Sequence, residues 1–352
     1  MPSSSRGSSP AAAEAAGERG LVDRIRRRVP PAPASLIVGI GDDAAVVSPD
    51  RGTLQILTTD ALVEGVHYDR RFSSPVEIGH KALAVNISDV ASMGGAARFA
   101  LLSLMLPDRT STDEIDGILD GLLTLAADAR IHLAGGNITR SPGPLVLDVT
   151  LIGSVRPRKI LTRAGGRPGD ALYVTGQIGA AAAGLAWLRE HPSAAPISGL
   201  RGNRPDDPEL SECVERYCRP VPRARVGALL GRNRAASACM DLSDGLADAV
   251  TQVATSSGTG ARIDASSLPL NRGASNWLAS RGEDPVIASV AGGDDYELLF
   301  AVPRRTASRL SGVAREARGV PLTRIGELTA DPAITLARNG RLEPLPAGFV
   351  HF

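Results

Sequence analysis

The sequence predicts a two-domain protein of the α/β class, with mixed α+β character. The chain has 352 residues and 43% of them are hydrophobic, so it can bury a sizeable core. Strand patterns alternate with helix patterns along the chain. Arg, Pro and Gly are dense in residues 156–169, as in a domain boundary. We therefore expect a disordered tail at 1–18 and domains at 19–158 and 159–352.

The N-terminal half begins with a stretch dominated by Ser, Ala, Gly and Pro, whose burial could not offset the entropy of ordering. This composition predicts the disordered tail. The elements expected after it are a helix in LVDRIRRR, a strand in LQILTTD, a helix in EIGHKALAVNISDVASMGG, a strand in RFALLSLMLP, a helix at 112–129, and strands in IHLAGG and PLVLDVTLIGSV.

The C-terminal half repeats the alternation with different turn signals. The elements expected there are a strand in ALYVT, a helix after GQIG, a surface loop at 192–208, helices up to residue 230, a helix opened by MDLSDGLADAV, a strand in ARID, a strand in DDYELLFAV, a helix at 307–317 and two further strands. Sequence repeats of short fixed period are not found, so a solenoid is not expected.

Composition excludes several classes of protein. The net charge of +1 provides no global positive field for nucleic acid. The two lysines, Lys81 and Lys159, both lie outside a GxxxxGK[ST] phosphate loop. Three cysteines form no disulfide framework, and no apolar run approaches a membrane span. We expect a soluble cytoplasmic protein with no nucleic-acid or membrane partner.

Acidic residues repeatedly occupy Gly- or Ser-bearing turns beside apolar strands. They are Asp42 and Asp43 in GIGDDAAVV, Asp60 in LTTD, Asp89 in NISD, Asp241 and Asp244 in DLSDG, and Asp294 and Asp295 in GGDDYEL. Carboxylates among apolar strands need partners, because burying an unpaired charge is very costly. Mg²⁺ prefers such oxygen ligands and bridges them to substrate phosphates. The set predicts an ATP-dependent enzyme that positions phosphates and neutralises their charge.

Each motif also has a plainer interpretation. Asp241 or Ser243 can cap the helix that follows DLSDG, and GGDDYEL can be a tight turn before a strand. His67, after LTTD, is either structural or a hydrogen-bond partner of a substrate phosphate or ring. Arg163 can pair with phosphate oxygens, but it is one of 37 arginines, and most of these are expected to have other roles.

The order of these motifs resembles that of the thiamine-monophosphate kinase family, within the aminoimidazole ribonucleotide synthetase-like superfamily. The matching segments are GIGDDAAVV, LTTDALVEGVH, HKALAVNISDVASMGG, GGNITR, LTRAGGRPGDALYVTG, DLSDGL, GGDDYELLF and the terminal HF. The resemblance runs from about residue 21 to residue 352. It implies a two-domain fold whose N-terminal domains join strands across a homodimer, with a C-terminal α/β domain.

The resemblance implies direct in-line transfer of the ATP γ-phosphoryl group to thiamine monophosphate, with several Mg²⁺ ions and no general base. Asp89 and Asp241 would be central. The implied Mg²⁺ ligands are Asp43, Thr58, Thr59, Asp60, Asp89, Asp241 and Asp244. The implied ATP contacts are Gly135, Gly136, Arg163 and Ser243, and the implied thiamine-phosphate contacts are His67, Asp294 and Phe349.

Three positions depart from the family pattern. A tyrosine that the family usually has near the adenine is replaced by small or acidic residues around Asp128 and Ala129. Asn137 stands where the family usually has an aspartate ligand, so its amide oxygen can coordinate Mg²⁺ but brings no charge. Asp294 stands where glutamate is common. Two alternatives to the kinase remain: another ATP-dependent enzyme of the superfamily with a different substrate, and a nucleotide- or thiamine-phosphate-binding homologue without turnover.

Overall fold

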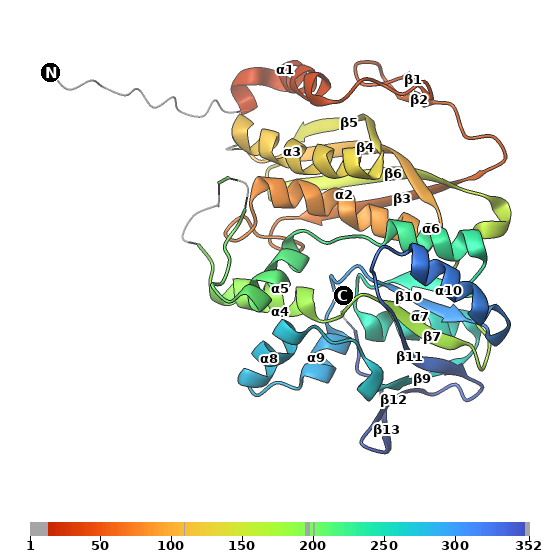
Figure 1. Cartoon of the computed structure of the whole chain (residues 1–352). Coiled ribbons are helices and arrows are strands. Elements are labelled where there is room, and N and C mark those ends of the chain that lie inside the picture. The colour runs from red at the N-terminus through yellow and green to blue at the C-terminus, as the bar shows by residue number, and fades with distance from the viewer. Residues whose placement is uncertain (1–12, 109, 194–197, 200, 349–352) are drawn as a thin grey trace.

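The chain folds into two stacked halves, each built on its own β-sheet (Figure 1). The computed structural model describes residues 13–108, 110–193, 198–199 and 201–348. The last strand of the first sheet ends at Val155, and the second sheet begins at Ala171. The domain boundary expected between residues 158 and 159 lies in this connection and stays a prediction.

The N-terminal half holds a four-stranded sheet with two helices on one face. Its elements are α1 (Ala13–Arg28), β1 (Leu36–Val38), β2 (Val46–Val47), β3 (Leu54–Val63), α2 (Pro75–Ser92), β4 (Ala96–Leu106), α3 (Thr112–Ala129), β5 (His132–Arg140) and β6 (Val146–Val155). The strand order is β3-β6-β4-β5, with only β4 and β5 parallel among these pairs. Strands β1 and β2 form a separate small ribbon.

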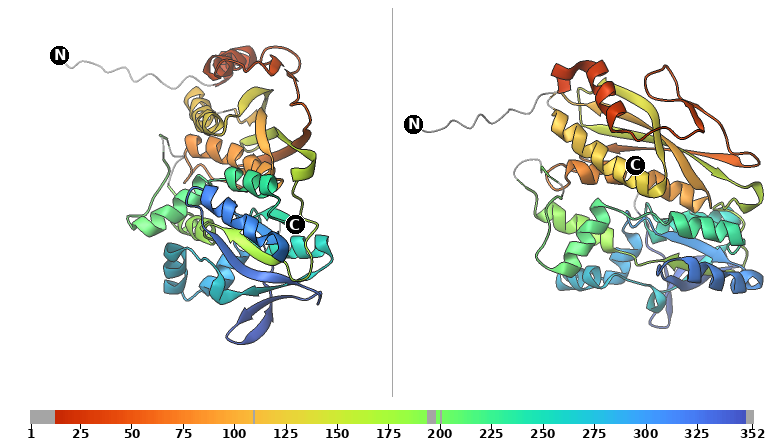
Figure 2. Two further views of the ribbon diagram at one scale, coloured as in Figure 1. Left: turned by 45° about the vertical axis from the view of Figure 1, so that its right-hand side comes forward. Right: turned by 45° about the horizontal axis from the view of Figure 1, so that its top comes forward.

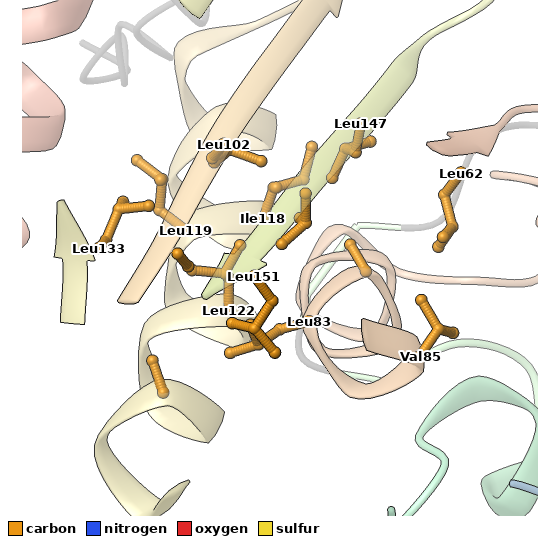
Figure 3. Packing of buried hydrophobic residues seen from close by; sticks show 14 of the residues in the cluster. Leu62, Leu83, Val85, Leu102, Ile118, Leu119, Leu122, Leu133, Leu147 and Leu151 are labelled. Atoms are coloured by element: carbon orange, nitrogen blue, oxygen red, sulfur yellow. The ribbon is translucent and has the colours of Figure 1, made fainter. Parts of the chain in front are cut away.

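The core of this half lies between the sheet and the helices α2 and α3. Figure 3 shows Leu102, Leu147 and Leu151 of the sheet gathered with Ile118 of α3 and Leu83 of α2. The two helices approach closely at Gly79, where an added Cβ would lie 1.8 Å from the Ile118 carbonyl oxygen. A side chain at that position would therefore push the helices apart.

Helix α2 lies between the two halves and is buried on nearly all sides (Figure 2). It begins with a capping box in which the Ser74 side chain accepts from the Glu77 amide and the Glu77 carboxylate accepts from the Ser74 amide. Its buried residues include Glu77, His80, Lys81, Asn86 and Ser88 as well as apolar side chains. Because both halves pack on α2, polar side chains along it can reach groups from either half.

The C-terminal half is a seven-stranded sheet between two layers of helices. Its elements are β7 (Ala171–Thr175), α4 (Ala180–Glu190), α5 (Pro208–Cys218), α6 (Ala224–Asn233), β8 (Ala238–Asp241), α7 (Leu246–Ser257), β9 (Gly260–Asp264), α8 (Arg272–Ser280), α9 (Pro285–Ala291), β10 (Leu298–Val302), α10 (Ala307–Glu316), β11 (Leu322–Thr329), β12 (Ile334–Arg338) and β13 (Arg341–Pro344). Short 3₁₀ turns span Pro157–Lys159, Ala265–Ser267 and Arg304–Thr306. The strand order is β13-β12-β9-β11-β7-β10-β8, with β12 and β9 parallel.

Strand β10 illustrates how this sheet is covered on both faces. Leu299 and Ala301 belong to the cluster that contains α7, whereas Phe300 belongs to the cluster of α6 and α10. Successive side chains of a strand point to opposite faces, so β10 is apolar throughout because both faces are covered. Its neighbour β8 ends at Asp241, which places that carboxylate at the edge facing α2.

Two expectations need correction, and a third stays a prediction. The third is the disordered tail at 1–18: helix α1 begins at Ala13 and is interrupted at Gly17, so it overlaps the end of the expected tail, and residues 1–12 lie outside the described part. The strand expected in DDYELLFAV begins only at Leu298, because Asp294 and Tyr296 have positive φ angles. Helices α8 and α9 were not expected.

Along the described ranges of the chain, helices long and apolar enough to cross a membrane are not found. The cytoplasmic location expected from composition stays a prediction.

Candidate active site

A cavity of about 460 Å³ lies between the two halves and is lined by residues of both, including Val85 and Asp89 of α2. Seven of the fifteen predicted site residues, from both halves, line it. Its lining includes Asp60, His67, Asp89, Asp241, Ser243, Asp244 and Asp294, together with Val85, Tyr217, Tyr296 and Gly348. Five of the predicted carboxylates therefore come together although they lie up to 234 positions apart in the sequence, from Asp60 to Asp294.

One end of the cavity is acidic. Asp60 at β3 and Asp89 on α2 lie close enough to interact directly, and the Thr58 hydroxyl donates to Asp89. The Ser88 hydroxyl, also on α2, donates to Asp241 at 2.7 Å and so joins the two halves. These hydroxyls hold the carboxylates in place without neutralising them.

Burial and mutual repulsion raise the pKa values of these carboxyl groups. Burial raises the pKa of Asp60 to about 7, with a further contribution from Asp89. Burial, followed by the charge of Asp89, likewise raises the pKa of Asp241 to about 7. Burial also raises the pKa of Asp89, although the Thr58 hydroxyl and the nearby Arg163 oppose this rise. The acidic end is thus a place where a bound cation would be strongly favoured.

The donor set at this end fits Mg²⁺, because carboxylate and hydroxyl oxygens are its preferred ligands. Within the described ranges, three or more His, Cys, Asp or Glu side chains do not converge as in a ready-made metal centre. An arrangement in which water and substrate phosphates complete the coordination is typical of Mg²⁺, which keeps several non-protein ligands.

The DLSDG turn is fixed by backbone contacts rather than by helix capping. Helix α7 has Gly245 at its N-cap, with no side-chain cap, so the interpretation of Asp241 or Ser243 as a cap is wrong. The Ser243 carbonyl accepts from the Asp294 amide at 2.7 Å, and the Leu242 carbonyl accepts from the Tyr296 amide at 3.1 Å. The two acidic motifs of the C-terminal half therefore form one connected surface.

The other end of the cavity carries His67 and Asp294. The Nδ1 atom of His67 accepts from the Val63 amide at 3.0 Å, which leaves the proton of the neutral ring on Nε2. Asp294 accepts from the Tyr296 hydroxyl at 3.0 Å and pairs with Lys81 at 3.2 Å. Its carboxylate is therefore oriented by two protein donors.

The segment that bears Asp294 is held from behind by two buried acids. Asp295 accepts from the amides of Gly179 and Ala181 at the start of α4, at 2.6 and 3.1 Å. Glu297 is fully buried and pairs with Arg216 and Arg223. These contacts explain how Asp294 and Tyr296 keep left-handed backbone conformations, which cost about 1–3 kcal/mol each.

A second group of predicted residues lies outside this cavity. Thr59, on the face of β3 away from the helices, donates to Asp148 of β6 at 3.0 Å. The other members are Gly135, Gly136 and Asn137 on β5 and the exposed Asp43 before β2. Arg163 donates to Gln252 and lies near Asp89. Phe349 lies outside the described residues.

The sequence analysis missed three residues that contribute to these surfaces. Tyr217 of α5 lines the cavity, and the ammonium group of Lys81 lies over the ring of Tyr217. Asp148 carries the only charge in the ten-residue strand β6, which was a visible signal. Lys81 is one of two lysines and lies eight residues, about two helical turns, before Asp89, and this spacing was also visible.

Two family models match the chain, one to each half. The model described as AIR synthase related protein, N-terminal domain, matches residues 41–155, and the corresponding C-terminal domain model matches residues 167–339. Together with the cavity between two mixed sheets, these matches define the class: an AIR synthase related protein. The expected two-domain fold is confirmed.

Relatives of known name identify the family within this class. The chain is 38% identical to the thiamine-monophosphate kinase of Escherichia coli strain K12 over 96% of this chain and 99% of the relative. It is 36% identical to that of Bacillus subtilis strain 168, over 76% and 81%. The chain belongs to the thiamine-monophosphate kinase family, which confirms the resemblance seen in the motifs.

Solved structures agree with this assignment. The thiamine-monophosphate kinase of Stenotrophomonas maltophilia K279a superposes with a TM-score of 0.79 at 34% identity, covering 92% of this chain and 96% of that chain. A structure described as AaThiL complexed with AMPPCP and TMP has a TM-score of 0.74 at 29% identity, covering 98% and 100%. Escherichia coli HypE, a hydrogenase maturation protein, shares the fold at 20% identity and a TM-score of 0.72.

Proposed function

We propose that this protein transfers the γ-phosphoryl group of ATP to thiamine monophosphate, giving thiamine diphosphate and ADP. A phosphate oxygen of thiamine monophosphate attacks the γ-phosphorus in line, and the bond to the β-phosphate oxygen breaks. The family assignment supports the reaction, and a structural neighbour carries both an ATP analogue and TMP.

The observation that carries the proposal is the two-ended cavity between the halves. Asp60, Asp89 and Asp241 line one end, and His67 and Asp294 line the other. The acidic end suits a phosphate bound together with a cation, and the polar side chains of the other end suit a ring. This arrangement matches a substrate in which a phosphate ester is joined to a cationic heterocycle. No side chain is required as a base, because the attacking phosphate oxygen already carries negative charge.

The residues proposed to hold Mg²⁺ are Asp60, Asp89 and Asp241, with Thr58 and Asp244 beside them. Bound there, Mg²⁺ would neutralise charge on the phosphates as the transfer proceeds. The Thr58 and Ser88 hydroxyls hold the Asp89 and Asp241 carboxylates in place at the acidic end. Further ions are proposed to bind Thr59 and Asn137, on the face of the N-terminal sheet that points away from α2 and α3, and Asp43 before β2.

ATP is proposed to contact Gly135 and Gly136 on β5, Arg163 and Ser243. Arg163 suits this role because it lies near Asp89 and so brings positive charge to the acidic end. His67 and Asp294 are proposed to orient thiamine monophosphate, with Phe349 as a third contact. The Nε2–H of His67 can donate a hydrogen bond to the substrate.

The decisive experiment is incubation of the purified protein with ATP, Mg²⁺ and thiamine monophosphate, with chromatographic detection of the products. We expect thiamine diphosphate and ADP in equal amounts. ATP binding without either product would overturn the proposal in favour of a non-catalytic binding homologue. Formation of ADP only with another phosphorylated acceptor would favour a different enzyme of the superfamily.

We also propose that the protein is a homodimer joined through its N-terminal sheets. Strand β3 is an edge strand with Leu54 and Leu57 exposed, at 46% and 68%, and Ile37 and Val46 of the neighbouring ribbon are exposed as well. An edge strand that exposes several apolar side chains favours association with another surface. Light scattering should give twice the chain mass for the wild type and for Leu342→Glu, a control at an exposed leucine of β13. It should give the monomer mass for Leu57→Glu; a monomeric wild type would contradict the proposal.

A further inference from the structure

Lys81 lies behind the cavity wall, at the end that carries His67 and Asp294. It belongs to α2, and its side chain is only 4% exposed. The residues that line the cavity include Val85 and Asp89 of the same helix, but not Lys81. A buried ammonium group that does not touch the cavity acts on a ligand only through its neighbours.

The ammonium group of Lys81 connects three segments that form this end of the cavity. Its Nζ atom donates to Asp294 Oδ2 and to the His67 carbonyl oxygen, both at 3.2 Å. It also lies 3.8 Å from the centre of the Tyr217 ring. The Tyr217 hydroxyl donates to the same His67 carbonyl at 3.1 Å. One lysine therefore joins the loop after β3, helix α5 and the loop before β10.

These contacts fix the two residues proposed to recognise the substrate. Asp294 has a φ of 67°, a strained conformation for a residue with a side chain, so its carboxylate depends on its partners for orientation. Lys81 holds Oδ2, while the Tyr296 hydroxyl holds Oδ1. The same ammonium group holds the backbone of His67, so the positions of both side chains are coupled through it.

Helix α2 also sets the distance between the two ends of the cavity. Lys81, Val85 and Asp89 are spaced four residues apart and lie along one face of the helix. Lys81 and Asp89 are therefore separated by about 12 Å along its axis. A single rigid helix thus anchors the ring end through Lys81 and the phosphate end through Asp89.

We infer that Lys81 is a positioning residue that sets the affinity and specificity for the thiamine part of the substrate. It does so by holding Asp294 and the His67 loop at a fixed position relative to the acidic end. The inference rests on the proposed function. It applies to a cationic heterocycle with ring nitrogens as hydrogen-bond partners, which is the chemical class that an oriented carboxylate and imidazole recognise.

The test compares Lys81→Met with Lys159→Met in the full-length protein. Methionine keeps the length of the side chain but removes the charge and the donors. Lys159 is the matched control, because its Nζ atom donates to a backbone carbonyl, that of Arg232, at a site away from the cavity. We expect Lys81→Met to raise the KM for thiamine monophosphate about tenfold while the KM for ATP stays within about twofold.

A double-mutant cycle with Asp294→Asn separates positioning from general destabilisation. If Lys81 acts through Asp294, the double variant should have a KM for thiamine monophosphate no more than about twofold above that of the worse single variant. If the KM of the double variant rises by the product of the two single increases, the two residues are not coupled. Lys81→Arg, which keeps the charge, should give a KM between those of the wild type and Lys81→Met. If Lys81→Met does not fold, an unchanged KM for thiamine monophosphate in Asp294→Asn overturns the inference, because Lys81 is inferred to act through Asp294.

The outcomes separate this inference from the proposed function. An active wild type in which Lys81→Met behaves like Lys159→Met overturns the inference alone. Equal increases in the KM values for both substrates also overturn it, since they indicate a general structural role. A wild type that neither binds nor phosphorylates thiamine monophosphate overturns the proposed function and this inference with it.

Discussion

The two ends of the cavity use carboxylates in opposite ways. At the acidic end, Asp60, Asp89 and Asp241 are held by hydroxyl groups and by one another, and their pKa values are raised. At the other end, Asp294 is paired with Lys81 and bonded to Tyr296. The first arrangement gains stability when a cation from solution binds, whereas the second is already balanced by protein groups.

This difference indicates how the site divides its work. A fixed carboxylate with protein partners keeps its geometry in the free protein and suits recognition of a rigid ring. Carboxylates without protein cations in direct contact suit a site that assembles only with metal and phosphates. Changes at the acidic end should therefore affect turnover most, and changes at the ring end should affect affinity for thiamine monophosphate.

The largest effect is expected for Asp89→Asn. Losing this charge should lower kcat roughly a thousandfold, because metal-assisted charge stabilisation contributes several kcal/mol to transfer. The fold should persist, since the asparagine amide oxygen can still accept from Thr58 and burial disfavours the charged form. Steady-state kinetics and thermal melting check both points, with the exposed Asp108→Asn as control. Near wild-type turnover in Asp89→Asn would rule out its assignment to the metal site.

A smaller and different effect is expected for His67→Ala. Loss of one hydrogen bond to a charged substrate should raise the KM for thiamine monophosphate about tenfold and leave the KM for ATP nearly unchanged. His132→Ala, a half-buried histidine on β5, serves as the control. Parallel changes in both KM values would argue that the two ends of the cavity are not separate.

A few-fold effect is expected for Asn137→Asp on the open face of the N-terminal sheet. An added carboxylate should lower the Mg²⁺ concentration for half-maximal activity by roughly threefold, because it adds charge to a weak ion site. Thr139→Asp adds the same charge two residues further along the same face of β5 and should have no such effect. If both variants respond alike, the effect is general electrostatics and Asn137 has no role as a ligand.

The last effect concerns stability rather than activity, and it lies at Asp295, which supports the ring end from behind. Burial raises its pKa to about 7 in the folded protein, against about 3.9 in the unfolded chain. Between these values the native state binds more protons than the unfolded state, so this group's contribution to stability falls as pH rises, by at most about 1.4 kcal/mol per pH unit.

Urea unfolding of the wild type and Asp295→Asn at pH 5 to 8 tests this linkage. The free energy of unfolding of the wild type should decline with pH relative to that of the variant. If the difference between the two stays constant over this range, the carboxyl group does not titrate there.

Regular elements were predictable where periodicity was strong, as in α3, whose bounds match the expected helix at 112–129. Helices α8 and α9 have only nine and seven residues, which is too short to establish a helical period. The DDYE segment alternates like a strand, but Asp295 and Glu297 pair with distant groups and hold it in a turn. Tertiary contacts thus override local pattern at the site.

The candidate site was predictable as a set of motifs but not as an arrangement. The turns that bear Asp60, Asp89 and Asp241 were visible because acids among apolar strands are unusual. The hydrogen bond from Ser88 to Asp241 joins residues 153 positions apart, and no local pattern reports such a contact. Lys81 was seen only as a rare lysine, since its role depends on residues from three other segments.

The most direct test of the two-ended site is calorimetric titration of the wild-type protein with thiamine monophosphate and with thiamine, each with and without Mg²⁺. The account predicts that Mg²⁺ strengthens the binding of thiamine monophosphate about tenfold or more and leaves that of thiamine unchanged, because only the phosphate reaches the acidic end. Binding of thiamine monophosphate that does not depend on Mg²⁺, or an equal gain for thiamine, would contradict it.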